Sequence, residues 1–236
     1  IKNKSLKKFK KKIITDIDLF YLFNKKLKSI VVTGTNGKST TCKLIAHMLK
    51  KNNFKCAIGG NIGTPILDLK NLNDRYVIIE ASSFQLSHSK FICPNIAIFL
   101  NLTNDHLDWH GNINNYLNSK LKIFKLQNKN HIAIINKKIK KTFIKKKFLS
   151  KSFIPKQNDY KKIKLKIMNK YLNSDINDEN MSFVYTIAKL LKIKEKSFIH
   201  SMKSFKGLHH RFEIFLKKKN IVFINDSKAT TFKATQ

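Results

Sequence analysis

The feature that most constrains the fold is a short apolar run that leads directly into a glycine-rich loop. Residues 29–33 (SIVVT) are predicted to form a buried strand, and residues 33–40 carry the loop sequence TGTNGKST. A helix is predicted at residues 39–51, where one face is apolar. That face is formed by Leu44, Ile45, Met48 and Leu49. A strand, a glycine turn and a helix in this order predict a phosphate-binding loop.

The chemistry of such a loop follows from helix geometry. The first backbone N–H groups of a helix have no partner within the helix, so they point toward a bound anion. Lys38 adds positive charge at the outer phosphates, and the Ser39 hydroxyl can ligate Mg²⁺. The sequence departs from the general pattern because Val32 occupies the position of its first glycine. The alternative is a glycine-rich turn that contains GKS by chance.

Strand and helix patterns alternate along most of the chain. Further strands are predicted at residues 56–58, 76–79, 96–100, 132–135 and 221–224, and further helices at residues 112–125 and 180–192. This alternation predicts an α/β fold with a mostly parallel sheet flanked by helices. Residues 137–170 are dense in lysine and have few turn signals, so we expect surface strands and loops there.

The chain has a large positive charge that comes almost entirely from lysine. Lysine and arginine total 48 against 14 acidic residues, a formal net charge of +34, yet only Arg75 and Arg211 are arginines. Arginine is the usual reader of bases and phosphates, so a solvated lysine surface is favoured over a nucleic-acid site. No apolar run reaches the roughly 20 residues that span a bilayer. Three scattered cysteines and the lack of a signal peptide favour a cytoplasmic protein.

Polar residues follow two of the predicted strands. Glu80 ends the strand at 76–79, and the run 101–108 (NLTNDHLD), which includes His106, follows the strand at 96–100. In an open α/β sheet, ligands bind at the carboxyl ends of the strands, so both segments face the predicted ligand crevice, and Glu80 is a candidate Mg²⁺ ligand. The alternatives are a solvated acid at a strand boundary and a hydrogen-bonded loop histidine.

One lysine lies near the centre of an apolar helix face. In the predicted helix 112–125 that face comprises Ile113, Tyr116, Leu117, Leu121 and Phe124, and Lys120 falls among them. Burial lowers the pKa of a lysine, and a neutral amine can add CO₂ to give a carbamate with oxygen ligands for a metal. The alternative is that Lys120 extends along the edge of the face to water.

Several motifs together resemble those of the Mur ligase family. They are TGTNGKST (33–40), GGNIG (59–63), EASSFQL (80–86), LNLTNDHLDWHG (100–111), Tyr116 followed by Lys120, GLHHRFE (207–213) and NDSKAT (225–230). The resemblance covers nearly the whole chain and points to the branch that adds D-glutamate to UDP-N-acetylmuramoyl-L-alanine. It implies a P-loop-type ATPase central domain at 29–207, preceded at 1–28 by the end of a UDP-binding domain. Residues 208–236 would begin a Rossmann-like third domain, and the fragment alone would be inactive.

The resemblance also implies a role for each motif residue. Lys38, Glu80, His106 and Lys120 would be catalytic. Ser39, Glu80, His106 and carbamylated Lys120 would hold two Mg²⁺ ions. Asn61, Ser82 and His106 would contact the UDP-muramoyl substrate. ATP would be bound by Gly34, Thr35, Asn36, Gly37, Lys38, Ser39, Thr40, Asn177, Asn180, Arg211, Asp226 and Lys228. The pattern departs from the family at residues 174–177 (SDIN) and at Thr231.

The implied reaction is ATP-dependent amide formation through an acyl phosphate, in the synthesis of peptidoglycan precursors for the cell wall. Its partners are UDP-N-acetylmuramoyl-L-alanine, D-glutamate and ATP, with no nucleic acid or membrane, and the protein would be a monomer. Two alternatives stay open. One is a basic module that binds polyanions, which gives no role to Glu80, His106 and Lys120. The other is a P-loop NTPase that makes no amide bond.

Overall fold

The computed structural model describes residues 9, 12–211, 213–219 and 221–228 of the 236-residue chain. Contacts between residues divide these into two compact units. Unit 1 comprises residues up to 38 together with 54–155, and unit 2 comprises 39–53 together with residues from 156 onward.

Unit 1 is built on a sheet of six parallel strands in the order β2-β3-β1-β4-β5-β6. They are β1 (Lys28–Thr33), β2 (Cys56–Gly60), β3 (Tyr76–Glu80), β4 (Ile96–Phe99), β5 (Ile132–Ile135) and β6 (Lys151–Phe153). The sequence predicted the first five with boundaries within two residues. In β1, Ile30, Val31 and Val32 are all fully buried, which explains why this strand is a continuous apolar run.

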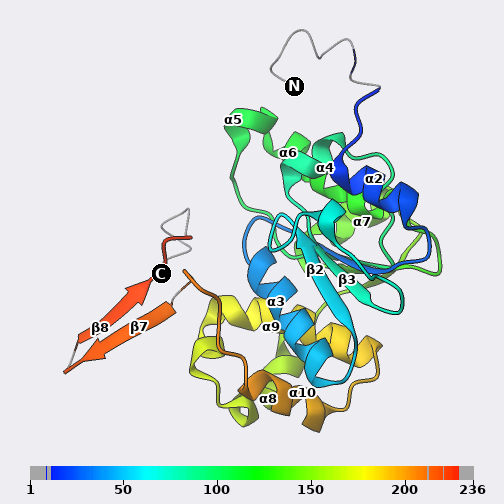
Figure 1. The fold of residues 1–236 in the computed structure, drawn as a ribbon. Helices are drawn as coiled ribbons and strands as arrows, with labels where there is room; N and C mark the ends of the chain where they lie inside the picture. The colour runs from blue at the N-terminus through cyan, green and yellow to red at the C-terminus, as the bar shows by residue number, and fades with distance from the viewer. Residues whose placement is uncertain (1–8, 10–11, 212, 220, 229–236) are drawn as a thin grey trace. The chain divides into compact units, whose positions relative to one another are not determined.

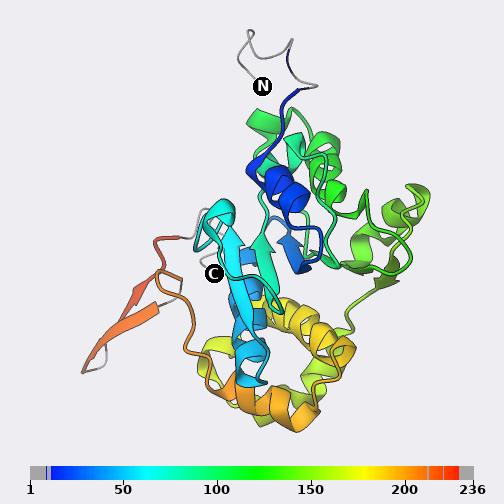
Figure 2. The same cartoon turned by 45° about the vertical axis from the view of Figure 1, so that its right-hand side comes forward.

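Helices of unit 1 gather on one face of this sheet (Figure 1 and Figure 2). They are α2 (Asp16–Phe23), η1 (Ile66–Asp68), α4 (Ser83–His88), α5 (Leu107–His110), α6 (Ile113–Leu121), η2 (Lys122–Phe124), η3 (Lys137–Ile139) and α7 (Lys140–Lys145). One hydrophobic cluster joins them to the sheet. It includes Val31, Val77 and Ile79 from the strands with Leu86, Leu121 and Phe124 from the helices. The predicted helix 112–125 is therefore confirmed as α6 followed by η2, with Asn112 as the N-cap.

A buried carboxylate ties α2 to the segment that follows α4. Asp18 is fully buried. It accepts hydrogen bonds from the Ser89 hydroxyl at 2.6 Å and from the backbone N–H groups of Phe91 at 2.7 Å, Lys90 at 2.8 Å and Thr15 at 3.1 Å. Burial raises the pKa of Asp18, but these donors outweigh it, so the pKa lies below its ordinary value.

Unit 2 is mainly helical. Its helices are α3 (Lys38–Lys51), α8 (Gln157–Ile167), η4 (Lys170–Asn173), α9 (Asp175–Leu190) and α10 (Glu195–Lys203). Only the first residue of α3, Lys38, belongs to unit 1. The helices are followed by an antiparallel hairpin of β7 (Glu213–Lys218) and β8 (Ile221–Asn225). The predicted strand 221–224 thus exists, but it pairs in this hairpin and not in the parallel sheet. The helix predicted at 180–192 is α9, which begins earlier, at Asp175. Ser174 is its N-cap residue, and the Ser174 hydroxyl accepts a hydrogen bond from the Asn177 N–H.

The prediction of surface strands and loops at residues 137–170 was wrong. Apart from β6, this region forms η3, α7 and α8. In α8 the residues Tyr160, Ile163 and Ile167 are buried at helical spacing. Six lysines between 156 and 170 surround this narrow stripe in the sequence, so the helical period is hard to recognise.

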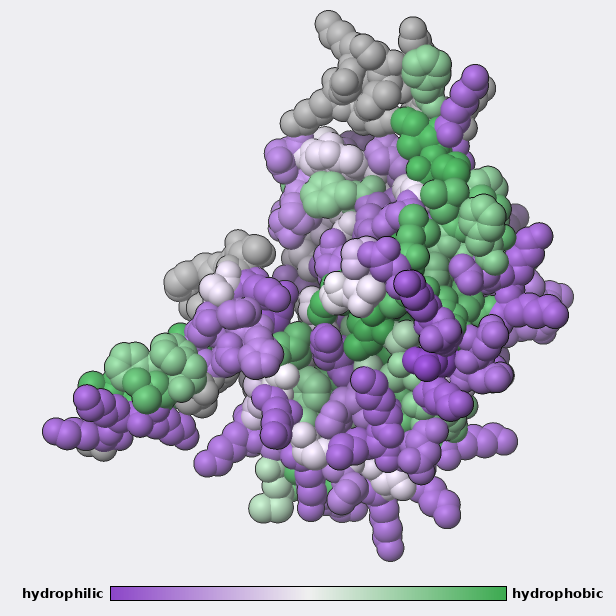
Figure 3. Space-filling view, viewed as in Figure 1, coloured by the Kyte–Doolittle hydropathy of each residue, from purple (hydrophilic) through white to green (hydrophobic). Residues whose placement is uncertain are grey.

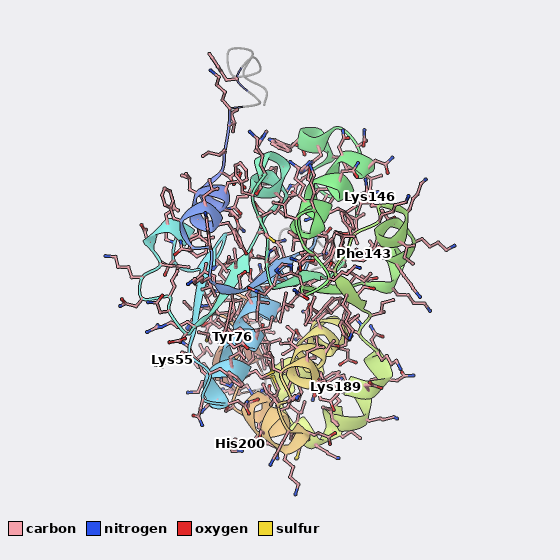
Figure 4. All side chains as sticks on the ribbon, turned by 90° about the vertical axis from the view of Figure 1, so that its right-hand side faces the viewer. Lys55, Tyr76, Phe143, Lys146, Lys189 and His200 are labelled. Carbon is pink, nitrogen blue, oxygen red and sulfur yellow. The ribbon has the colours of Figure 1, made fainter. Side chains whose placement is uncertain are left out.

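The surface is dominated by lysine. Figure 3 shows hydrophilic residues over most of the viewed face, and Figure 4 labels exposed lysines of both units, among them Lys55, Lys146 and Lys189. Apolar side chains are exposed on the β7–β8 hairpin, including Phe215 and Ile221. Among the residues that the structure describes, no helix is long and apolar enough to cross a membrane.

We expect Asp18→Asn to lower the free energy of unfolding of unit 1 by about 1–3 kcal/mol, because an amide accepts these four donors less well than a carboxylate. Since the folded pKa of Asp18 is depressed, the loss should be full above about pH 5 and should shrink as the pH falls through the folded pKa. Urea unfolding monitored by circular dichroism, with amide exchange at Lys90 and Phe91, measures the change. Asp68→Asn, an exposed carboxylate, is the matched control; equal stability of the two variants would contradict the expectation.

Candidate active site

The glycine-rich loop joins β1 to α3 and is held by the segment after β4. The Thr35 N–H donates to the Asn101 carbonyl oxygen at 3.0 Å, and the Asn36 N–H donates to the Asn101 side chain at 2.9 Å. A Cβ atom at Gly34 would lie 2.9 Å from the Cβ of Leu100, so only glycine fits. Gly37 has a φ of 80°, which glycine adopts without strain. The predicted loop is therefore a folded feature of unit 1.

Two lysine amines meet at this loop. The Nζ atom of Lys38 donates to the carbonyl oxygens of Thr35 at 2.7 Å and Gly34 at 3.1 Å. The Nζ atom of Lys120 donates to the same Gly34 oxygen at 2.7 Å and lies 4.3 Å from the centre of the Tyr116 ring. The apolar face of α6 thus delivers Lys120 to the phosphate loop.

Lys120 is 1% exposed, so it does not extend along the helix edge to water. Burial lowers its pKa to about 6, and repulsion by Lys38 acts in the same direction, while Asp105 opposes both. At neutral pH this amine is therefore mostly uncharged. An uncharged amine is the nucleophilic form, and this is the state that the carbamate prediction required.

Glu80 lies at the carboxyl end of β3 and is 2% exposed. Its Oε1 atom accepts a hydrogen bond from the Asn61 side chain at 2.9 Å, and the Asn61 N–H donates to the Glu80 backbone oxygen at 2.9 Å. Gly60 permits this approach, because a Cβ there would lie 2.5 Å from the Glu80 oxygen. The Oε2 atom of Glu80 is buried with no hydrogen-bond partner among the described residues. A buried carboxylate oxygen in this state fits a cation.

His106 and Lys120 both contact the Tyr116 ring. His106 is the N-cap residue of α5 and has a φ of 53°, in the left-handed region. Its ring centre is 6.2 Å from that of Tyr116 and 4.8 Å from that of Phe84, and its Nε2 atom is 3.5 Å from an Asp105 oxygen. The Tyr116 hydroxyl donates to Thr35 at 3.3 Å. Tyr116 therefore connects the loop, Lys120 and His106.

Ser82 serves first as a helix cap. Its hydroxyl accepts from the Gln85 N–H at 3.3 Å and donates to the Gln85 side chain at 3.0 Å, which is a capping box for α4. Asn61, another of the three predicted substrate contacts, is exposed.

The remaining predicted nucleotide contacts lie in unit 2. Ser39 and Thr40 are in the first turn of α3. Asn180 accepts from Thr41 at 3.4 Å. One side-chain N–H of Asn177 donates to the Tyr171 carbonyl oxygen at 2.8 Å. Arg211, Asp226 and Lys228 lie beside the hairpin, and Arg211 and Asp226 are close enough to Tyr171 to influence its pKa.

Two site residues were missed by the sequence analysis. Asn101 binds the loop through both its backbone and its side chain, and its place directly after a buried strand was the available signal. His110 is buried beside Ser83 and Ser119, and nothing in the sequence separates it from an ordinary loop histidine. Among the described residues, no three His, Cys, Asp or Glu side chains group as metal ligands. A cation near Glu80 would therefore need other oxygen donors as well.

The depressed pKa of Lys120 predicts how stability depends on pH. Between about pH 6 and 10.5 the unfolded chain binds more protons than the folded chain, so the free energy of unfolding rises with pH. Lys120→Met should flatten this rise and raise the free energy of unfolding at pH 7 by about 1–4 kcal/mol, because no amine must then be neutralised on burial. Urea unfolding at several pH values tests this, with exposed Lys125→Met as control. An unchanged pH slope in Lys120→Met would refute the assignment.

Comparison with known proteins identifies the family to which this chain belongs. A UDP-N-acetylmuramoylalanine–D-glutamate ligase from Rickettsia prowazekii is 39% identical over 238 residues, covering 92% of this chain and 53% of that protein. Among solved structures, MurF from Acinetobacter baumannii has a TM-score of 0.65 at 16% identity, covering 89% of this chain and 52% of that one. A MurF ligase from Thermotoga maritima, solved in complex with ADP, has a TM-score of 0.64 at 17% identity, covering 89% and 56%. These structures share the fold.

The chain spans about half the length of the curated relatives it matches. The family model for the Mur ligase middle domain matches residues 32–210, which contain the phosphate loop, Glu80, His106 and Lys120. That match takes in the whole six-stranded sheet except the first residues of β1. This chain therefore belongs to the Mur ligase middle domain family.

Proposed function

We propose that this chain is the central part of a longer ATP-dependent ligase that adds D-glutamate to UDP-N-acetylmuramoyl-L-alanine. The observation that carries the proposal is the buried, largely uncharged amine of Lys120, held 2.7 Å from the carbonyl oxygen of Gly34 in the phosphate loop. A phosphate loop alone is common to many enzymes. A reactive amine buried against it is a specific arrangement, and it supports a role for Lys120 in the chemistry. The names of the curated relatives support the choice of amino acid.

The proposal includes the domain organisation. Residues 1–28 would end an amino-terminal UDP-binding domain, 29–207 would form the central ATP-binding domain, and 208–236 would begin a third domain. The exposed apolar residues of the β7–β8 hairpin agree with a sheet that is completed by further chain. The fragment by itself would then have little or no ligase activity.

ATP binding rests on the loop. We assign its phosphates to the backbone and hydroxyl groups of Gly34, Thr35, Asn36, Gly37, Ser39 and Thr40, with the Lys38 ammonium at the γ-phosphate. The solved structure of a fold neighbour with ADP supports nucleotide use by this fold. Within unit 2 the same proposal assigns Asn177, Asn180, Arg211, Asp226 and Lys228 to the nucleotide. Asn177 would reach the nucleotide through its second side-chain N–H or its amide oxygen, since one N–H donates to the Tyr171 carbonyl oxygen.

Glu80 supplies the best argument for Mg²⁺. Its buried Oε2 atom, which has no hydrogen-bond partner in the described part of the chain, is an oxygen donor of the kind that Mg²⁺ prefers. Ser39, His106 and Lys120 as its carbamate would complete the ligand set for two ions. When bound, these ions would neutralise charge between the triphosphate and the attacking carboxylate.

The reaction would proceed in two steps. The alanyl carboxylate oxygen attacks the γ-phosphorus of ATP, and the bond to the β-phosphate oxygen breaks to give an acyl phosphate and ADP. The amine of D-glutamate then attacks the acyl carbon, loses a proton, and phosphate leaves. This chain would contribute positioning and charge, with Lys38 at the phosphates and Asn61, Ser82 and His106 at the UDP-linked substrate. The proposed setting is the cytoplasm, with a monomeric enzyme in cell-wall precursor synthesis.

The full-length protein provides the direct test. With ATP, Mg²⁺ and UDP-N-acetylmuramoyl-L-alanine, we expect sustained phosphate release only when D-glutamate is added, with L-glutamate as the matched control. Phosphate release that ignores D-glutamate would identify an NTPase instead. Salt-sensitive binding to any DNA duplex, with no phosphate release, would identify a polyanion-binding protein.

Lys120→Ala in the full-length protein should lower kcat at least about 100-fold, since it removes a group placed at the reacting phosphates. Added bicarbonate should not restore activity, because alanine has no amine to carbamylate. Lys125→Ala, an exposed lysine of the following turn, should retain activity. Rates that match those of the wild type would remove Lys120 from the chemistry.

A further inference from the structure

His110 is a buried histidine that the proposed chemistry does not use. It is the last residue of α5 and is 7% exposed. Its ring stacks on Phe84 with centres 5.8 Å apart and planes 19° apart, and it lies 5.0 Å from the Tyr116 ring. Each ring nitrogen also has a serine hydroxyl within reach, so the ring is fixed both by packing and by hydrogen bonds.

The hydrogen bonds define the state of the ring. The Ser119 hydroxyl donates its only hydrogen to the Asn115 carbonyl oxygen at 2.9 Å. At the 3.5 Å contact between the Ser119 oxygen and Nδ1 of His110, the nitrogen must therefore be the donor. In a neutral imidazole the other nitrogen is then an acceptor, so Nε2 accepts from the Ser83 hydroxyl at 3.0 Å. Burial is the main cause that lowers the pKa of His110 below its ordinary value, which agrees with a neutral ring.

Both serines lie close in the sequence to candidate catalytic groups. Ser83 is the first residue of α4, three residues after Glu80. Ser119 directly precedes Lys120 in α6, and Tyr116 on the same helix contacts both His110 and Lys120. One imidazole therefore bridges the start of α4 and the helix that presents the buried amine.

We propose that His110 is a positioning residue that holds α6, and with it Lys120, in fixed register against the first turn of α4. The proposal rests on the proposed ligase function. It matters there because a displacement of about 1 Å of a group at a reacting centre costs about 100-fold in rate. Hydrogen bonds at both ring nitrogens set which way the imidazole faces between Ser83 and Ser119.

Two substitutions separate hydrogen bonding from packing. His110→Phe keeps an aromatic ring against Phe84 and Tyr116 but loses both hydrogen bonds. His110→Gln loses the ring but offers an amide oxygen that can accept from Ser83. If His110 acts by positioning, Gln should be the more active variant even where Phe is the more stable. If His110 is only a packing residue, the order of activity should follow the order of stability.

We expect His110→Phe in the full-length ligase to lower kcat about 10–100-fold, with the KM for ATP within about twofold of the wild type. His110→Gln should recover most of this loss. Combining Ser83→Ala with His110→Phe should cost little more than His110→Phe alone, because both remove the same bond. His88→Phe, a neighbouring histidine of α4 that contacts Trp109, is the control and should leave kcat unchanged.

A second readout does not depend on turnover. With ¹³C-labelled bicarbonate, the carbamate signal of the wild type should be retained in His110→Gln and reduced severalfold in His110→Phe. Thermal unfolding of each variant confirms that it is folded. Equal kcat and equal carbamate signals in wild type and His110→Phe would overturn the inference, and so would greater activity of Phe than of Gln. Wild-type protein that fails to release phosphate with D-glutamate would instead overturn the proposed function.

Discussion

A lysine amine buried among apolar side chains needs an acceptor, and the backbone of the phosphate loop supplies it. The Nζ atoms of Lys120 and Lys38 both donate to the carbonyl oxygen of Gly34. Two full positive charges at one oxygen within a buried site would repel strongly. The fold accommodates both amines because burial and this repulsion lower the pKa of Lys120 to about 6. The neutral amine is thus imposed by how α6 packs against the loop.

The second constraint is the short helix α4, which lies between the strand bearing Glu80 and the helix bearing Lys120. At six residues it is too short to be stable alone, so its neighbours hold it. Its first turn is held through Ser83 and His110. The Lys122 ammonium donates to the carbonyl oxygens of Ser87, near the end of α4, and of Ser89, its C-cap residue. The segment that follows α4 is also tied to α2 by the buried carboxylate of Asp18, so α4 is held at both ends.

Much of this fold could be predicted because the pattern of apolar residues along most of its strands and helices is easy to recognise. Five strands of the parallel sheet are continuous apolar runs, and the glycine-rich loop marks the first of them. The segment at 137–170 could not be predicted in the same way, because the buried stripe of α8 (Tyr160, Ile163 and Ile167) is narrow and lysines occupy the rest of the helix. Likewise, the pattern at 221–224 identified a strand but not its partner, since pairing depends on residues far away in the chain.

For the candidate site, the sequence by itself determined which chemical groups are available and on which elements they lie. It fixed a glycine loop before a helix, an acid at the end of β3, and a lysine on an apolar helix face. Only the tertiary structure decided that Lys120 reaches Gly34, that Asn61 binds one Glu80 oxygen while the other is buried, and that His110 bridges two helices. The physical reason is that burial and hydrogen-bond partners, which set pKa and orientation, arise from residues brought together by folding and not from their spacing along the chain.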